Sequence, residues 1–171
     1  MEKPILFFDM DGVLVDFMSV VKEYHPDIDL LEEHERKPLI KKLCLLPEFY
    51  SKMPPYPGAI DSWHTLGQKF DNYILSAPKW QNPFSYIEKR IWCDEYLGES
   101  VYKKLILSHN KGILSGFGLI DDRLKYGVDK FKGLHIHFGT DKFPDWEQTT
   151  KYLMNYDLTE YLEQQKTLTN S

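Results

Sequence analysis

The chain has 171 residues, a length that suits one domain with an ordinary hydrophobic core and room for a small insert. Its two cysteines are too few for a disulfide framework, which favours a reduced, cytoplasmic setting. A formal net charge of −5 argues against an extended nucleic-acid surface, but it is compatible with a small phosphorylated substrate.

The N-terminus predicts neither export nor membrane insertion. Residues 1–4 lead straight into a short apolar stretch, without the basic region, long apolar core and cleavage site of a signal peptide. No apolar run approaches the ~20 residues that cross a membrane.

Residues 4–9 form a continuous apolar run that ends in an acid, which is typical of a buried strand in a parallel sheet. Asp9 and Asp11 then stand two residues apart, and Gly12 allows a sharp turn after them. Two carboxylates so close together must be hydrated, paired or bound to a cation, because they repel each other. The arrangement suits phosphoryl transfer, in which one carboxylate attacks phosphorus, Mg²⁺ offsets the negative charges and the second carboxylate handles the proton.

Two other interpretations of this segment compete. A calcium loop would need an acid where Phe7 stands and a glutamate where Met18 stands, so that interpretation fails. A polar turn without function at the end of a strand stays open on these residues alone.

Residues 17–55 interrupt the expected alternation of strands and helices. They contain helical patterns at 17–24 and 39–43, broken at His25-Pro26 and Lys37-Pro38, and no strand candidate. We expect a small helical insert directly after the first strand.

The rest of the chain alternates between apolar runs and helical patterns, which predicts an α/β fold with a parallel sheet. Four further strands are expected at residues 72–76, 104–108, 118–121 and 134–138, and helices at 57–70, 82–98 and 144–153. Most of these strands end in polar residues, at the edge where ligands bind in open α/β sheets. Residues 157–171 are polar with a weak helical pattern and are expected to fray.

Four segments together resemble the motifs of the haloacid dehalogenase superfamily: Phe7 to Asp16, Ser76, Lys111, and Asp121-Asp122. Further segments are similar, in order, to the 5′(3′)-deoxyribonucleotidases. These are Asp9 to Phe17, Pro57-Gly58-Ala59, Ser76-Ala77-Pro78, Glu88-Lys89 with Trp92, Leu97-Gly98, Leu107 to Lys111 and Leu119 to Arg123.

The resemblance implies a haloacid dehalogenase-like, Rossmann-like core: an open parallel sheet with helices on both faces and a small helical cap. The first strand would be central, with the second and third on one side and the fourth and fifth on the other. We therefore expect a core of residues 1–16 and 56–156, a cap of residues 17–55 and a polar tail of residues 157–171.

The resemblance also implies roles for the acidic residues. Asp9 would attack phosphorus and form an aspartyl-phosphate, and Asp11 would protonate the leaving alcohol and then activate water. Mg²⁺ would be held by an Asp9 oxygen, the Asp11 backbone carbonyl and a fourth-motif carboxylate, with Asp122 as the direct ligand and Asp121 beside it. The bland alternative for the fourth motif is a turn acid followed by a helix N-cap.

The remaining implied roles concern the substrate. Ser76 and the Ala77 backbone N–H would bind phosphoryl oxygens, Lys111 would neutralise the phosphoryl group, and Lys89 would contact substrate. Their alternatives are a turn-capping hydroxyl for Ser76 and solvated surface lysines for Lys111 and Lys89.

Two aromatic residues of the insert are placed by the resemblance against the base. Phe17 and Tyr50 would stack on it, where core packing of the insert is the alternative. Core packing is preferred for Phe49, and a structural role for His135 and His137.

The sequence departs from the family in three places. The insert is shorter than in the animal enzymes, Ala77 replaces a common serine, and His109 replaces a common arginine. These changes leave the phosphatase chemistry intact and bear on the nucleotide preference.

We therefore expect a Mg²⁺-dependent phosphatase of (deoxy)ribonucleoside monophosphates, and a homodimer is compatible with the sequence. Alternatives are a phosphatase for another small phosphoester or a polynucleotide 3′ end, and an inactive binding module on the same fold. The intact acidic and lysine set argues against the inactive module.

Overall fold

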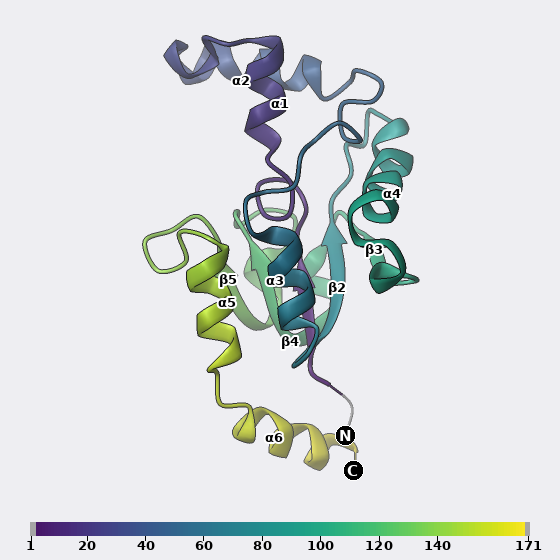
Figure 1. Cartoon of the computed structure of the whole chain (residues 1–171), viewed down its shortest axis with the longest axis vertical. Coiled ribbons are helices and arrows are strands. Elements are labelled where there is room, and N and C mark those ends of the chain that lie inside the picture. The colour runs from purple at the N-terminus through teal and green to yellow at the C-terminus, as the bar shows by residue number, and fades with distance from the viewer. Residues whose placement is uncertain (1–2, 170–171) are drawn as a thin grey trace.

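A five-stranded parallel sheet forms the centre of the computed structural model, which describes residues 3–169 (Figure 1). The strands are β1 (Ile5–Phe8), β2 (Asp71–Ser76), β3 (Leu105–Leu107), β4 (Ser115–Asp121) and β5 (Lys132–His137). Their order, β3-β2-β1-β4-β5, confirms the expected central position of the first strand. The order of the strands also confirms the α/β fold class.

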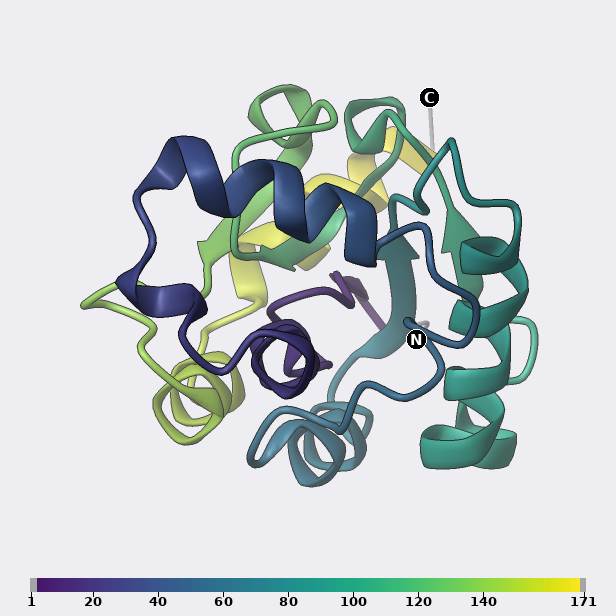
Figure 2. The same ribbon diagram turned by 90° about the horizontal axis from the view of Figure 1, so that it is seen from above.

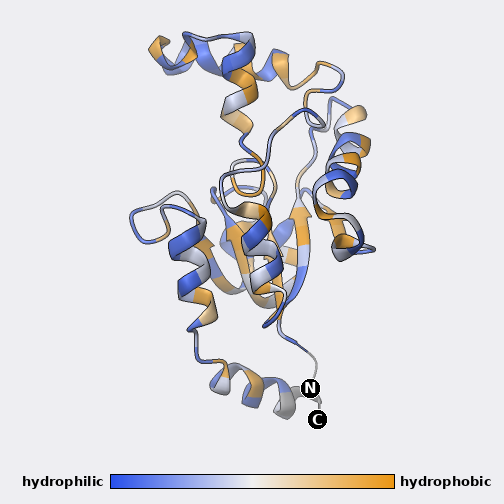
Figure 3. Ribbon diagram, in the orientation of Figure 1, coloured by the Kyte–Doolittle hydropathy of each residue, from blue (hydrophilic) through white to orange (hydrophobic). Residues whose placement is uncertain are grey.

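Each central strand is buried on both sides, which explains why it reads as a continuous apolar run. Leu6 and Phe8 of β1 face one side of the sheet and belong to the large core, whereas Phe7 faces the smaller cluster on the other side. Figure 3 shows the hydrophobic colour concentrated along these strands.

The face of the sheet that carries the larger hydrophobic core is covered by α3 (Ala59–Leu66), α4 (Phe84–Leu97) and α5 (Trp146–Met154). Each helix contributes a tryptophan to the core, and Phe8 lies 5.0 Å from the Trp63 ring and 5.7 Å from the Trp146 ring. The other face is covered by 3-10 turns at Lys111–Ile113 and Val128–Lys130. Helical segments therefore cover both faces, as expected, but the long helices lie on one of them.

Between β1 and α3 the chain forms α1 (Phe17–Tyr24), a 3-10 turn (Ile28–Leu30) and α2 (Glu33–Leu43). These helices stand above the carboxyl edge of the sheet (Figure 1), and Figure 2 shows α2 crossing over that edge. Asp16 caps α1 by accepting the Ser19 backbone N–H at 3.0 Å. The insert thus lies over the end of the sheet where the polar strand ends meet.

The expected break at Lys37-Pro38 is wrong, because Pro38 lies inside α2. Proline removes one backbone donor from the helix. A capping box between Glu32 and Glu35 satisfies donors at the start of the helix, so the helix begins well before Pro38 and continues past it.

The fraying expected for residues 157–171 stays a prediction, and residues 170–171 of this tail lie outside the described residues. Thr159–Thr169 form α6, and the Tyr161 ring packs edge-on against Phe117 at 5.4 Å. One aromatic anchor on the core supports a helix that the weak sequence pattern alone would not.

Candidate active site

Three polar residues meet at the carboxyl edge of the sheet. Asp9 follows β1, Ser76 ends β2 and Asp121 ends β4. The Asp9 backbone N–H donates to the Ile120 carbonyl at 2.9 Å, which fixes the end of β1 against β4. Parallel strands thus deliver side chains that are far apart in sequence to one place.

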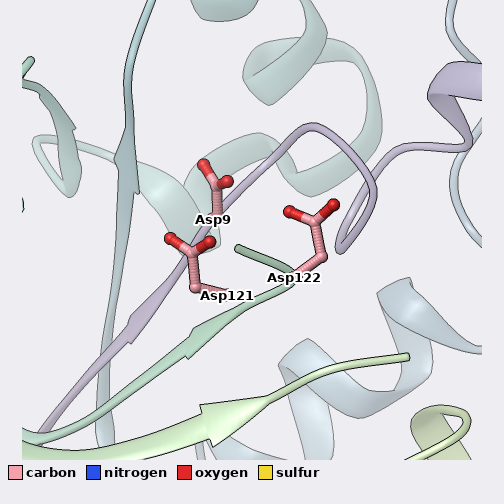
Figure 4. Close-up of side chains that lie close together, drawn as sticks. All are labelled: Asp9, Asp121 and Asp122. Atoms are coloured by element: carbon pink, nitrogen blue, oxygen red, sulfur yellow. The ribbon is translucent and has the colours of Figure 1, made fainter. Parts of the chain in front are cut away.

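The carboxylates of Asp9, Asp121 and Asp122 lie close together and point in the same direction (Figure 4), and one carboxylate oxygen from each lies within 4.8 Å of the others. Lys111 lies beside this cluster and is almost completely buried. Its Nζ is 3.0 Å from Asp9 Oδ1 and 2.5 Å from Asp121 Oδ2. The cluster of three carboxylates is therefore only partly neutralised by one lysine.

The electrostatics show how crowded the three acids are. Burial and then the neighbouring Asp9 raise the pKa of Asp121 to about 6, although Lys111 acts in the opposite direction. Burial also raises the pKa of Asp122, against the effect of Arg123. Burial works to lower the pKa of Lys111, but Asp9 and Asp121 outweigh it and that pKa is raised. Additional positive charge at this point would relieve the crowding.

The two fourth-motif aspartates differ in their partners. Asp121 has both oxygens engaged, by Lys111 and by the Arg123 backbone N–H at 2.9 Å. Asp122 accepts from Arg123 Nε at 3.2 Å through Oδ2, whereas its buried Oδ1 has no hydrogen-bond partner among the described residues. Asp122 therefore offers a free ligand oxygen and Asp121 does not.

Gly12 makes the close approach of the first loop to Asp122 possible. Its φ is +80°, and a Cβ at this position would lie 2.7 Å from Asp122 Oδ2. Any other residue would be strained in its backbone and would push the carboxylate away.

Asp11 does not join the three-carboxylate cluster through its side chain. Its Oδ1 accepts from Lys89 Nζ at 2.5 Å, and Lys89 is 1% exposed. Lys89 Nζ also lies 5.0 Å from the centre of the Tyr50 ring. The solvated-surface alternatives for Lys89 and Lys111 are therefore wrong.

A cavity of about 1090 Å³ opens beside these groups. Asp9, Asp11, Lys111 and both fourth-motif aspartates line it together with Ala77 and Pro78. Ser76, which directly precedes Ala77 and Pro78, is fully buried, and its Oγ has no hydrogen-bond partner among the described residues. No hydrogen bond among the described residues supports the alternative in which Ser76 caps a turn.

The two aromatic residues expected at the base also line the cavity. Phe17 is half-buried and meets Phe49 edge-on at 5.6 Å, whereas Tyr50 is 4% exposed beneath Lys89. Phe49 is fully buried in the core, as expected. Phe17 therefore presents more surface to the cavity than Tyr50 does.

Sequence reasoning missed the group that holds the insert in place, whereas it expected a structural role for His137, which lies beside the fourth motif. Glu88 accepts the backbone N–H groups of Glu48 at 2.7 Å and Tyr50 at 2.9 Å, and so fastens the end of the insert to α4. His137 Nε2 lies 3.1 Å from the Asp122 carbonyl oxygen. The spacing of Glu88, Lys89 and Trp92 places them on one face of α4, which is buried. An acidic residue on such a face is the sequence signal that could have indicated the role of Glu88.

Comparisons with known proteins place the chain among nucleotidases. The family model described as 5′ nucleotidase, deoxy (pyrimidine), cytosolic type C protein matches residues 3–151. A protein of Vibrio phage KVP40 with the provisional name 5′(3′)-deoxyribonucleotidase is 46% identical over 89% of this chain and 85% of its own. The human 5′(3′)-deoxyribonucleotidase, cytosolic type, is 27% identical over 81% of this chain and 75% of its own.

A solved structure from Burkholderia xenovorans LB400, provisionally described as a haloacid dehalogenase-like hydrolase, aligns with 84% of this chain and 85% of its own. Its sequence identity is 15% and the TM-score is 0.44.

Proposed function

The chain belongs to the 5′ nucleotidase, deoxy (pyrimidine), cytosolic type C family and is a phosphoric monoester hydrolase, and from this premise we propose its substrate and mechanism. The proposed substrates are (deoxy)ribonucleoside monophosphates, hydrolysed with Mg²⁺ through an aspartyl-phosphate. The observation that carries the proposal is the cluster of Asp9, Asp121 and Asp122 around a buried Lys111.

The residues at the cluster fit a divalent cation. Mg²⁺ prefers carboxylate and carbonyl oxygens, and Asp122 Oδ1 is a buried oxygen without a partner among the described residues. Asp9, the Asp11 backbone carbonyl and Asp122 would hold the ion, with Asp121 tied to Lys111 beside them. When bound, Mg²⁺ supplies positive charge that offsets the repulsion between a phosphoryl group and the Asp9 carboxylate.

Asp9 is the proposed nucleophile. One of its oxygens attacks phosphorus, the bond from phosphorus to the leaving oxygen breaks, and Asp11 gives its proton to the leaving alkoxide. Asp11 then takes a proton from water as the water oxygen attacks the phosphoryl group on Asp9, which releases phosphate, restores the Asp9 carboxylate and returns Asp11 to its protonated form.

The other side chains bind and orient the substrate in this proposal. Lys111 pairs with phosphoryl oxygens as well as with Asp9, and the Ser76 hydroxyl and Ala77 N–H donate to the same oxygens. Lys89 contacts the substrate and keeps Asp11 in place through the 2.5 Å contact. Phe17 and Tyr50 line the part of the cavity that would receive the nucleoside.

A phosphate-release screen tests the proposal. It compares nucleoside 5′- and 3′-monophosphates, sugar phosphates and an oligonucleotide with a 3′-phosphate, each with Mg²⁺ and with excess EDTA. We expect release from the nucleoside monophosphates with Mg²⁺ only. Full activity in EDTA, or release from sugar phosphates alone, would overturn it.

Two further expectations stay predictions: a homodimer and a cytoplasmic location. Among the described residues, no helix is long and apolar enough to cross a membrane.

A further inference from the structure

The cavity carries basic side chains that the proposed mechanism does not use. Arg36 and Lys41 face it from α2, and Lys79 and Lys125 face it from the loops that follow β2 and β4. The cavity-lining residues of α2 recur every three or four positions, so they share one face of the helix: Glu33, Arg36, Lys37, Ile40, Lys41 and Cys44. Cations thus line the cavity on both the insert and the sheet side.

The acids near these cations already have partners. Asp29 pairs with Lys22, and Glu33 pairs with Lys37, each at 2.6 Å. Asp16 caps α1, and Arg123 contacts Asp122.

Among the described residues, four of the cavity-lining cations form no ion pair with a carboxylate. Within residues 3–169, Arg36, Lys41, Lys79 and Lys125 have no carboxylate within ion-pair distance. Arg36 and Lys79 are half-buried, and partly desolvated cations without an anion favour an anionic ligand.

The charged residues on the insert side of the cavity lie close enough to those on the sheet side to interact with them. Lys37 lowers the pKa of Glu33 at the start of α2, and Arg36 and Lys125 act in the same direction. Burial raises the pKa of Cys44 at the end of α2, and Lys79 opposes that shift. Lys125 and Lys79, which follow β4 and β2, also line the same cavity as Glu33 and Cys44 at the two ends of α2, in agreement with the path of α2 over the sheet edge in Figure 2.

We propose that these four cations form a subsite for a second phosphate group on the substrate. The inference rests on the proposed function, because it assumes that the phosphate to be cleaved lies at Asp9. The cavity exceeds the ~300–1,000 Å³ of typical small-ligand pockets, so it has room for a nucleotide with an additional phosphate. Arginine and lysine side chains are the usual partners of phosphate oxygens.

A second phosphate has two chemical sources: a nucleoside 3′,5′-bisphosphate, or the internucleotide phosphate of a short strand with a 3′-terminal phosphate. Exposed aromatic rings beside the cavity offer a way to tell these two ligands apart, because only the strand has a second base that can contact them. Trp80 and Tyr126 are 73% and 51% exposed, and the His109 ring lies between them, 5.5 Å from Trp80 and 6.3 Å from Tyr126. A neighbouring base could stack on these rings only if the ligand is a strand.

The test uses equilibrium binding to the full chain in EDTA, where no turnover consumes the ligand, and kcat/KM with Mg²⁺. The ligands are thymidine 5′-monophosphate, thymidine 3′,5′-bisphosphate and a thymidine dinucleotide with a 3′-phosphate. The variant carries Arg36→Gln, Lys41→Gln, Lys79→Gln and Lys125→Gln. Its control carries glutamine in place of four exposed lysines outside the cavity, Lys103, Lys130, Lys142 and Lys151, and so loses the same charge.

We expect the wild type and the control to bind a ligand with two phosphates at least about tenfold more tightly than the monophosphate. The cavity variant should lose that preference and keep its kcat/KM on the monophosphate within about threefold. A preference for the dinucleotide that Trp80→Ala weakens identifies a strand, and a preference for the bisphosphate that Trp80→Ala leaves unchanged identifies a nucleotide.

Equal binding of all ligands, or equal losses in the cavity variant and its control, would overturn the subsite. If the monophosphate is bound and hydrolysed without such a preference, only this inference fails. If no nucleotide is hydrolysed, the proposed function fails, and the binding data still decide on the subsite.

Discussion

Lys89 and Asp11, which are far apart in the chain, form a part-buried ion pair in which Lys89 is the fully buried partner. Asp11 must reach both the leaving oxygen and the attacking water in the proposed mechanism, so its position decides the rate of both steps. Lys89 is a buried residue of α4, and its Nζ lies 2.5 Å from Asp11 Oδ1. The pair therefore links the packing of a helix to the chemistry at the sheet edge.

We predict that Lys89→Met lowers kcat on a nucleoside monophosphate by about 10–100-fold, because Asp11 loses its fixed position. Lys89→Arg should recover part of the loss, since it keeps the charge. Lys104→Met is the matched control, because Lys104 forms a 2.7 Å ion pair with Asp71 away from the cavity. Steady-state kinetics that put Lys89→Met within threefold of the wild type would refute the positioning role.

The Cys93 thiol makes the stability of the fold depend on pH. Cys93 is fully buried, and burial raises the pKa of its thiol from its ordinary value of 9.0 to about 12. The folded state therefore keeps the proton that the unfolded state loses, so stability falls as pH rises above about 9.

Urea unfolding at pH 8 and pH 10 should show the effect, with a loss of about 1 kcal/mol that Cys93→Ala lacks. Cys93→Ala itself should lower stability at both pH values through lost packing. Parallel changes with pH in the wild type and the variant would rule out Cys93 as the cause.

Among the elements, α1 and α2 bear most directly on substrate choice, because they stand over the cavity. Phe17 begins α1 and lines the cavity, whereas Phe49 packs against it from the fully buried core. Tyr50 is a less clean probe, since its ring supports Lys89.

Phe17→Ala should cost about 1–3 kcal/mol of kcat/KM on nucleoside monophosphates through lost stacking. It should cost far less on p-nitrophenyl phosphate, which has no base. Phe49→Ala is the control for damage to the insert, and we expect it to lower the melting temperature and affect both substrates alike. The stacking role fails if Phe17→Ala lowers activity on both substrates equally.

The elements also show what sequence alone could supply. Apolar runs and capping signals located the strands and helices, because burial on both faces leaves no polar positions in β1. Proline commonly breaks or kinks a helix, so the sequence predicts a break at Pro38, but in this chain α2 continues through it. The resemblance, rather than any periodicity, supplied the order of the strands.

At the scale of the molecule, the site draws on segments separated by most of the chain. The spacing of Asp9, Lys111 and Asp121 could be matched to known motifs, and their convergence could be predicted from the topology. The contact between Asp11 and Lys89 depends on how α4 packs, and the gathering of Arg36, Lys41, Lys79 and Lys125 at the cavity depends on how α2 packs. Local sequence patterns do not specify either arrangement.

Removal of metal tests the charge balance of the whole fold. Because Asp9, Asp121 and Asp122 converge, saturating Mg²⁺ should stabilise the protein by about 1–3 kcal/mol and raise the melting temperature by several degrees. Asp122→Asn should reduce the shift, and Asp129→Asn, on the 3-10 turn at Val128–Lys130, serves as the control. An unchanged melting curve with and without Mg²⁺ in the wild type would contradict a metal site.

Phosphorylation of Asp9 is the step on which the whole proposed mechanism depends, and a burst experiment detects it. In Asp11→Asn, p-nitrophenolate can still leave without a proton, but the water that should cleave the aspartyl-phosphate has no base. We predict a burst of one p-nitrophenolate per chain with Mg²⁺, and a phosphoryl group on the peptide that contains Asp9, neither of which appears in Asp9→Asn/Asp11→Asn. The wild type must turn over p-nitrophenyl phosphate for the test to apply. If it does, the absence of a burst in Asp11→Asn, or a phosphoryl group on a residue other than Asp9, would contradict the aspartyl-phosphate mechanism.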